Sequence, residues 1–149
     1  MQESPSWIER AAALVLARSI LGLLFLMAGW YKVFVLGAAQ HAQEFFVDAY
    51  SDSWIPVFVL QALGSAIPFL ELAAGLLLVI GFRIREALLT VAAVLALVTY
   101  GHLLAEPMFD ITPQIFPRAA LTLFLLFVPR EMDRWSLDAW LSTKRRREG

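Results

Sequence analysis

The chain has 149 residues, of which 60% are hydrophobic, and its mean hydropathy is +0.69. A soluble domain of this length does not need to bury so much apolar surface, so the composition favours a membrane protein. The net charge of −1 argues against nucleic-acid binding, and the absence of cysteine excludes disulfides, thiolate metal sites and iron–sulfur clusters in this chain.

Four apolar segments approach or exceed the length of about 20 helical residues that a bilayer requires. The spans are expected at about 11–36, 56–82, 86–105 and 113–129, and the last is the shortest. Residues 1–10 precede them, and residues 130–149 follow as a basic amphipathic tail. The expected fold is therefore all-α, with one integral membrane domain built as an antiparallel four-helix bundle.

Basic residues are distributed unevenly among the connecting segments. Arg10 precedes the first span, Arg83 and Arg85 join the second to the third, and a cluster of basic residues follows the fourth. The other two connections contain acidic residues but no lysine or arginine. The positive-inside rule then places both termini in the cytoplasm of a multi-pass protein in a bacterial-type inner membrane.

The tail "RWSLDAWLSTKRRR" is predicted to form a short interfacial helix, with Ser136 as its N-cap and Asp138 in its first turn. Its four consecutive basic residues would each attract anionic lipid by about 1 kcal/mol. A segment that merely sets topology would have the same composition.

Arg18 and Glu71 lie deep inside the expected spans, whereas Lys32, His102 and Arg118 lie toward span ends. Arg18 is roughly 10 Å, and Glu71 roughly 16 Å, from the cytoplasmic end of its span. A charge at the bilayer centre costs about 2.5–3.5 kcal/mol, so we expect these two to form an ion pair, directly or through water. Such a pair either fixes helix packing or serves as a proton or ligand site.

Pro68 interrupts the second span three residues before Glu71. Because proline has no N–H group, the carbonyl of Gly64 loses its helical partner and a local polar cavity is expected there. An acid beside a helix break is typical of a functional site in a membrane protein.

A second polar group is expected at the outer end of the bundle, where an aromatic-walled pocket would suit an anion or a quinone head group. Its candidate residues stand at span ends: Lys32, His102, Glu106, Arg118, Tyr31 and Tyr100. Alternatively, Lys32 alone extends to the membrane interface, and His102 is a packing residue.

The sequence offers weak candidates for a metal site and no nucleophile motif. His41, Glu44 and Asp48 would share one helix face outside the membrane, and a solvated face is favoured over a cation site. With two histidines in the chain, a buried bis-histidine haem is not expected. No metal or covalent cofactor is therefore predicted, a quinone is the candidate cofactor, and no catalytic residue can be assigned.

Two stretches resemble the signatures of the DoxX family. "ARSILGLLFLMAGWYKVF" resembles the first signature through Arg18, Gly22, Gly29 and Lys32. "PFLELAAGLLLVIGFRIREA" resembles the second through Glu71, Gly75 and Gly81. His102 and the stretches "FPRAALTLFLL" and "RWSLDAWL" are also similar. Residues 39–54 do not align, and residues 128–131 replace the family's glycine-proline-glycine turn.

The resemblance implies a small four-helix inner-membrane protein. Some members serve as the membrane part of thiosulfate:quinone oxidoreductase, and others are assigned to membrane oxidoreductase complexes or to sulfur and redox stress. The expected function is a subunit of, or accessory to, a membrane redox system, with lipid and a partner subunit or second copy as partners. A non-enzymatic membrane anchor or assembly factor, or a small proton-coupled transporter, is the alternative.

Overall fold

The computed structural model describes residues 6–148, except for the side chains at 130 and 145–148. The described chain is helical and contains no strand, which confirms the predicted all-α class. The elements are α1 (Trp7–Trp30), η1 (Tyr31–Val35), α2 (Ala38–Ala42), η2 (Gln43–Asp48), α3 (Val57–Ile80), α4 (Ile84–Ala105), α5 (Ile115–Phe127), η3 (Arg130–Met132) and α6 (Leu137–Glu148). Both η1 and η2 are π-helical turns, and η3 is a 3₁₀ turn.

Three helical segments are long and apolar enough to cross a membrane: Trp7–Val35, Val57–Ile80 and Ile84–Ala105. Helix α5 is apolar but has 13 residues, so it is roughly 20 Å long, whereas the hydrocarbon core is about 30 Å thick. Large apolar side chains point outward from these helices; Phe58, for example, is 74% exposed. The chain is therefore a multi-pass membrane protein.

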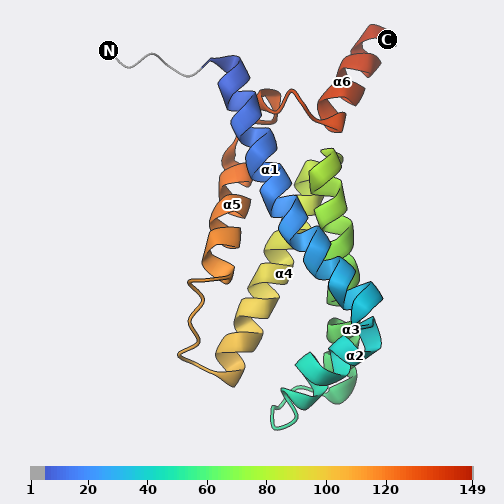
Figure 1. Cartoon of the computed structure of the whole chain (residues 1–149), viewed down its shortest axis with the longest axis vertical. Helices are drawn as coiled ribbons and strands as arrows, with labels where there is room; N and C mark the ends of the chain where they lie inside the picture. Colours follow the sequence, from blue (N-terminus) through green and yellow to red (C-terminus); the bar gives the residue numbers. More distant parts are fainter. Residues whose placement is uncertain (1–5, 149) are drawn as a thin grey trace.

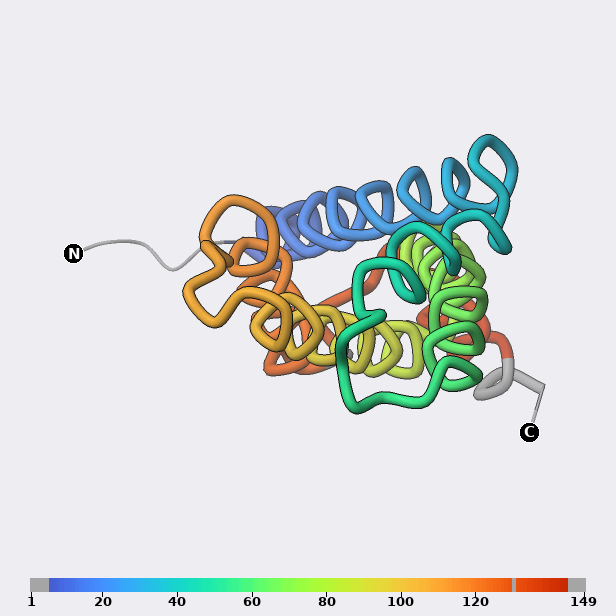
Figure 2. Tube along the Cα trace, turned by 90° about the horizontal axis from the view of Figure 1, so that it is seen from below, coloured from blue at the N-terminus to red at the C-terminus, as the bar shows by residue number. Residues whose placement is uncertain are grey.

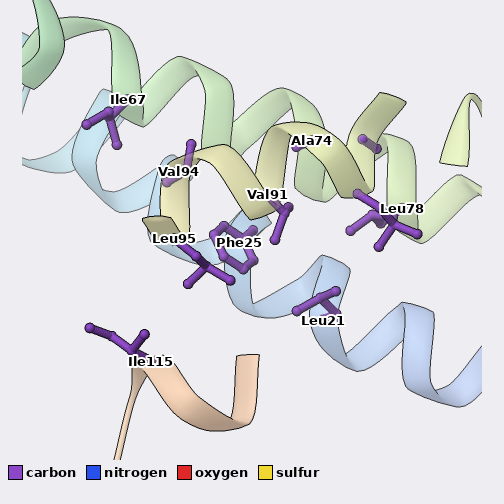
Figure 3. Close-up of a cluster of buried hydrophobic side chains, with 11 residues drawn as sticks. Leu21, Phe25, Ile67, Ala74, Leu78, Val91, Val94, Leu95 and Ile115 are labelled. Carbon is purple, nitrogen blue, oxygen red and sulfur yellow. The ribbon is translucent and has the colours of Figure 1, made fainter. Parts of the chain in front are cut away.

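Helices α1, α3, α4 and α5 alternate in direction along the chain (Figure 1). Helix α1 packs on α3, α3 on α4, α4 on α5, and α5 on α1, which closes a ring. Seen from below, α1 and α4 run along opposite sides of this ring (Figure 2). Its centre is filled by apolar side chains from all four helices, including Phe25, Leu78, Val91 and Ile115 (Figure 3).

The tail helix α6 is fixed to the turn between α3 and α4. The carboxylate of Asp138 accepts hydrogen bonds from the backbone N–H groups of Arg83 and Ile84, at 2.9 and 3.0 Å. The N–H of Asp138 donates to the carbonyl of Gly81 at 3.0 Å. Ser136 accepts from the N–H of Ala139 at 3.2 Å, which confirms its predicted role as the N-cap of α6.

Helices α1 and α3 approach each other closely at two points where a glycine has no side chain. A Cβ atom at Gly29 would overlap the backbone of Leu72, and one at Gly75 would overlap the backbone of Leu26. Helices in lipid gain little from hydrophobic association, and small residues let them gain contact by close packing. The α1–α3 pair is thus held nearly backbone to backbone.

We predict that Gly75→Ala lowers the free energy of unfolding by about 1–3 kcal/mol, because the added methyl group forces the two backbones apart. Denaturation in detergent micelles measures the change. The control is Ala73→Val, which adds volume on the exposed face of the same helix. Equal stability of the two variants would contradict the close-packing explanation.

Candidate functional site

The membrane interior contains an ion pair between Lys32 in η1 and Glu71 in the middle of α3. The Lys32 Nζ atom lies 3.0 Å from Oε1 and 2.7 Å from Oε2 of Glu71, so it bonds both carboxylate oxygens. The Glu71 side chain is 8% exposed and the Lys32 side chain 27% exposed. The buried carboxylate is therefore neutralised by a lysine that keeps one side open.

The predicted pairing of Arg18 with Glu71 is wrong, and the packing of α1 on α3 explains why. Gly29 sits against Leu72, so the following turn of α1 brings Lys32 to Glu71. Arg18 lies three turns before Gly29, roughly 16 Å along the helix. Distances from the span ends place Arg18 and Glu71 in the same half of the bilayer. The glycine contacts between α1 and α3, however, determine which residues face each other.

Arg18 instead binds the segment that leads into α6. Its Nε atom lies 3.5 Å from Oδ2 of Asp133, and its Nη2 group donates to the carbonyl of Trp135 at 3.1 Å. Gly81 lies directly against the guanidinium, where a Cβ atom would overlap it. Burial raises the pKa of Asp133, while the Arg18 charge acts in the opposite direction. Arg18 thus holds the tail to the end of the helix ring.

The helix break at Pro68 is filled by a histidine from the connecting segment. The Gly64 carbonyl, which Pro68 cannot satisfy, lies 2.8 Å from Nδ1 of His41 in α2. A Cβ atom at Gly64 would overlap Ala42, so the absent side chain lets α2 reach the carbonyl. Since a carbonyl can only accept, Nδ1 carries the hydrogen and Nε2 of the neutral ring keeps its lone pair.

His41 is 4% exposed, and its ring lies 5.3 and 5.7 Å from those of Phe45 and Phe46. Burial lowers the pKa of His41 below its ordinary value of 6.5, the hydrogen bond to Gly64 opposes that shift, and the charges of Lys32 and Glu71 act in opposite directions. His41 is therefore neutral at pH 7 and lies within electrostatic reach of the ion pair. We call Lys32, Glu71 and His41 the membrane triad.

The expected outer pocket is not assembled in the described part of the chain. His102 bonds the carbonyl of Val98 in its own helix at 2.8 Å and packs on Phe109, with the rings 4.3 Å apart. Tyr31 and Tyr100 are 56% and 52% exposed. No hydrogen bond or ion pair joins the expected pocket residues to one another among residues 6–148: Lys32, His102, Glu106, Arg118, Tyr31 and Tyr100. The reason is the ring order, since α4 lies opposite α1 (Figure 2).

The sequence interpretation missed His41 as a neighbour of Glu71. It grouped His41 with Glu44 and Asp48, but Glu44 bonds Gln40 and Asp48 bonds Gln43. Within the described residues, no three potential ligands gather to hold a metal ion. The unsatisfied carbonyl created by Pro68 was the available signal, because it required a donor from elsewhere in the chain.

A model of the DoxX family matches residues 13–105, which include Arg18 and the whole membrane triad. The chain belongs to the DoxX family. No curated protein and no solved structure matches it. In this DoxX protein, α5 and the tail with Asp133 lie beyond the matched residues.

The ion pair makes a prediction about stability. Removing one member leaves a buried charge unpaired, so Lys32→Met and Glu71→Leu should each lower the free energy of unfolding by about 3 kcal/mol. The double variant should recover most of that loss, because neither charge remains. A double-mutant cycle in detergent micelles measures the coupling, and additive losses would show that the two residues do not interact.

The His41 environment predicts a pH dependence. Because the folded-state pKa is lowered, the unfolded chain binds more protons below about pH 6.5, and the native state loses stability as the pH falls. His41→Gln should reduce this loss relative to the unsubstituted protein. Asp133 contributes with the opposite sign but is present in every variant. Unfolding measured between about pH 7.5 and 5 tests the difference, and identical curves for the two proteins would contradict it.

Proposed function

We propose that this DoxX protein is a redox-linked membrane subunit that binds the head group of a quinone, or a small anionic ligand, at the membrane triad. The observation that carries the proposal is the Lys32–Glu71 ion pair, which joins η1, at the end of α1, to α3 within the candidate membrane spans. Ionisable residues inside a membrane domain are costly, so they commonly mark ligand or proton pathways.

Lys32 can donate a hydrogen bond to a ligand while it is paired with Glu71. A Lys ammonium has three donors, and the two carboxylate oxygens of Glu71 accept two hydrogen bonds from it. With its side chain 27% exposed, Lys32 can direct a third donor to a quinone carbonyl or an anionic oxygen. The two hydrogen bonds to Glu71 hold the ammonium group in place, and a hydrogen bond from a charged donor is stronger than one from a neutral donor.

The neutral imidazole of His41 adds the complementary function. Its Nδ1–H is used by the Gly64 carbonyl, so Nε2 is available as an acceptor for a hydroxyl or a proton. A quinone head group alternates between carbonyl and hydroxyl oxygens when it is reduced, and the triad offers one donor and one acceptor. This chemistry suits either redox state of such a ligand.

The redox role assigned here is that of a subunit or accessory protein. The chain contains no cysteine, so electrons would pass through the bound ligand or a partner protein. The proposed location is a bacterial-type inner membrane with both termini in the cytoplasm. It is supported by Arg10 in the first turn of α1 and by the basic residues that join α3 to α4 and follow α5.

A membrane anchor or assembly factor is the second candidate. The observation that favours it is the pair itself, because Lys32 and Glu71 already satisfy each other and would stabilise α1 on α3 without any ligand. The two functions differ in whether the open side of Lys32 is used.

The test is a titration of the purified protein in nanodiscs with decylubiquinone, followed by quenching of tryptophan fluorescence. Lys32→Gln should weaken binding about tenfold or more, the effect of losing a hydrogen bond from a charged donor. Arg118→Gln is the matched control, since it removes a cation that the outer-pocket hypothesis would also use.

Folding must be separated from binding in this experiment. The exchanged variant Lys32→Glu/Glu71→Lys keeps an ion pair, so it should fold while presenting the lysine from α3 instead of η1. Loss of quinone binding in this folded variant supports a ligand site. Unchanged binding in Lys32→Gln, or an equal loss in Arg118→Gln, would refute the proposed function.

A further inference from the structure

A large cavity lies at the other end of the molecule from the membrane triad, between α6 and the ends of α1, α4 and α5. Its volume is about 1490 Å³. One part of its wall is apolar and comes from the membrane helices, with Leu14 on α1 and Leu125 on α5. Another part is polar and includes Arg83, Arg134 and Ser142. The cavity is therefore amphipathic in the same sense as a phospholipid.

The wall formed by the tail is held in place. Asp138 binds the first amides of α4, and Arg18 binds Asp133 and the Trp135 carbonyl. These contacts fix both the segment before α6 and its first turn. A fixed wall keeps the apolar and polar sides of the cavity at a constant separation.

Arg18 lines this cavity and is not fully satisfied by the protein. It is 2% exposed, and its Nε and Nη1 groups are buried without a hydrogen-bond acceptor among the described residues. The Asp133 carboxylate reaches Nε only as an ion pair at 3.5 Å. A buried arginine with unused donors beside a cavity indicates an anionic or strongly polar occupant.

Aromatic residues locate this end of the molecule at the membrane surface. Trp7, Trp135 and Trp140 are 55%, 51% and 59% exposed. Two of them carry cations over their rings: Arg134 lies 5.3 Å from the Trp7 centroid and Lys144 5.8 Å from that of Trp140. Tryptophan and basic side chains together are typical of the lipid head-group region.

The acidic residues of the cavity are partly neutralised. Asp133 forms its ion pair with Arg18 through Oδ2, while its Oδ1 is buried without a hydrogen-bond partner among the described residues. Asp138 accepts from two backbone amides. Glu86 and Glu131 line the same cavity at exposed positions, as do Arg83 and Arg134. In the sequence, basic residues also occupy positions 144–147 of α6, although the side chains at 145–147 lie outside the described residues. The described lining thus holds four carboxylates and three arginines; two of the carboxylates are bound within the protein, and Arg83 and Arg134 supply positive charge for an anion.

We infer that this cavity binds one anionic phospholipid, with its phosphate near Arg83 and Arg134 and the start of its acyl chains along Leu14 and Leu125. The lipid would seal α6 onto the helix ring. This site is separate from the membrane triad and does not depend on the function proposed for it.

The experiment uses the full chain in a neutral detergent and compares three probes: dioleoyl phosphatidylglycerol, dioleoyl phosphatidylcholine and inorganic phosphate. Native mass spectrometry counts retained lipid, and the thermal unfolding midpoint reports its effect. Phosphatidylglycerol should be retained about tenfold more strongly than phosphatidylcholine and should raise the midpoint. Inorganic phosphate should do neither.

The decisive variant is Arg83→Gln/Arg134→Gln, which should abolish the preference for phosphatidylglycerol. Its matched control is Arg10→Gln/Arg85→Gln, which removes the same charge from the same end but outside the cavity. An equal loss in the control would mean general surface attraction and would overturn the site. Equal retention of both lipids, or stabilisation by inorganic phosphate alone, would also overturn it.

Discussion

The close approach of α1 and α3 determines which charged residues meet. Gly29 and Gly75 let each backbone lie against the other helix, and a side chain at either position would overlap main-chain atoms. Main-chain contact cannot slide by a fraction of a turn without collisions, so the register is fixed. Lys32 then meets Glu71, and Arg18 is carried to the level of Gly81 at the end of α3. The two charge sites are consequences of one packing constraint.

The interruption of α3 also depends on a missing side chain. Pro68 removes a donor, and Gly64 removes the bulk that would keep the connecting segment away from the freed carbonyl. His41 satisfies the acceptor and becomes buried within reach of both charges. A helix interruption that would otherwise cost free energy therefore positions an imidazole whose second nitrogen is not committed to the backbone.

The sequence predicted the class of fold well and the pairing of its charges poorly. Hydropathy identified the apolar helices, and Ser136 was recognised as an N-cap, because both are encoded locally. The partners of Arg18 and Glu71 depend on helix register, which follows from contacts between glycines distant in the chain. The predicted outer pocket does not match the structure, because the prediction assumed that span ends at one membrane surface are neighbours. In the structure, α4 lies opposite α1 in the ring. The position of the α2 segment could not be predicted, because this stretch does not align with the family signatures.

Helix α1 connects two sites with different chemical requirements. In the middle of α1, Arg18 contacts Gly81 at the α3–α4 turn and Asp133 and Trp135 in the tail, so changes in the tail act on the end of the ring. At its end, Lys32 and the π-helical turn contact α3 beside a proline break, where the backbone is already irregular. The rigid glycine-packed stretch between them separates the two regions. The ligand proposed for the triad would therefore exchange protons or hydrogen bonds locally, while the tail is bound to the same helix at Arg18.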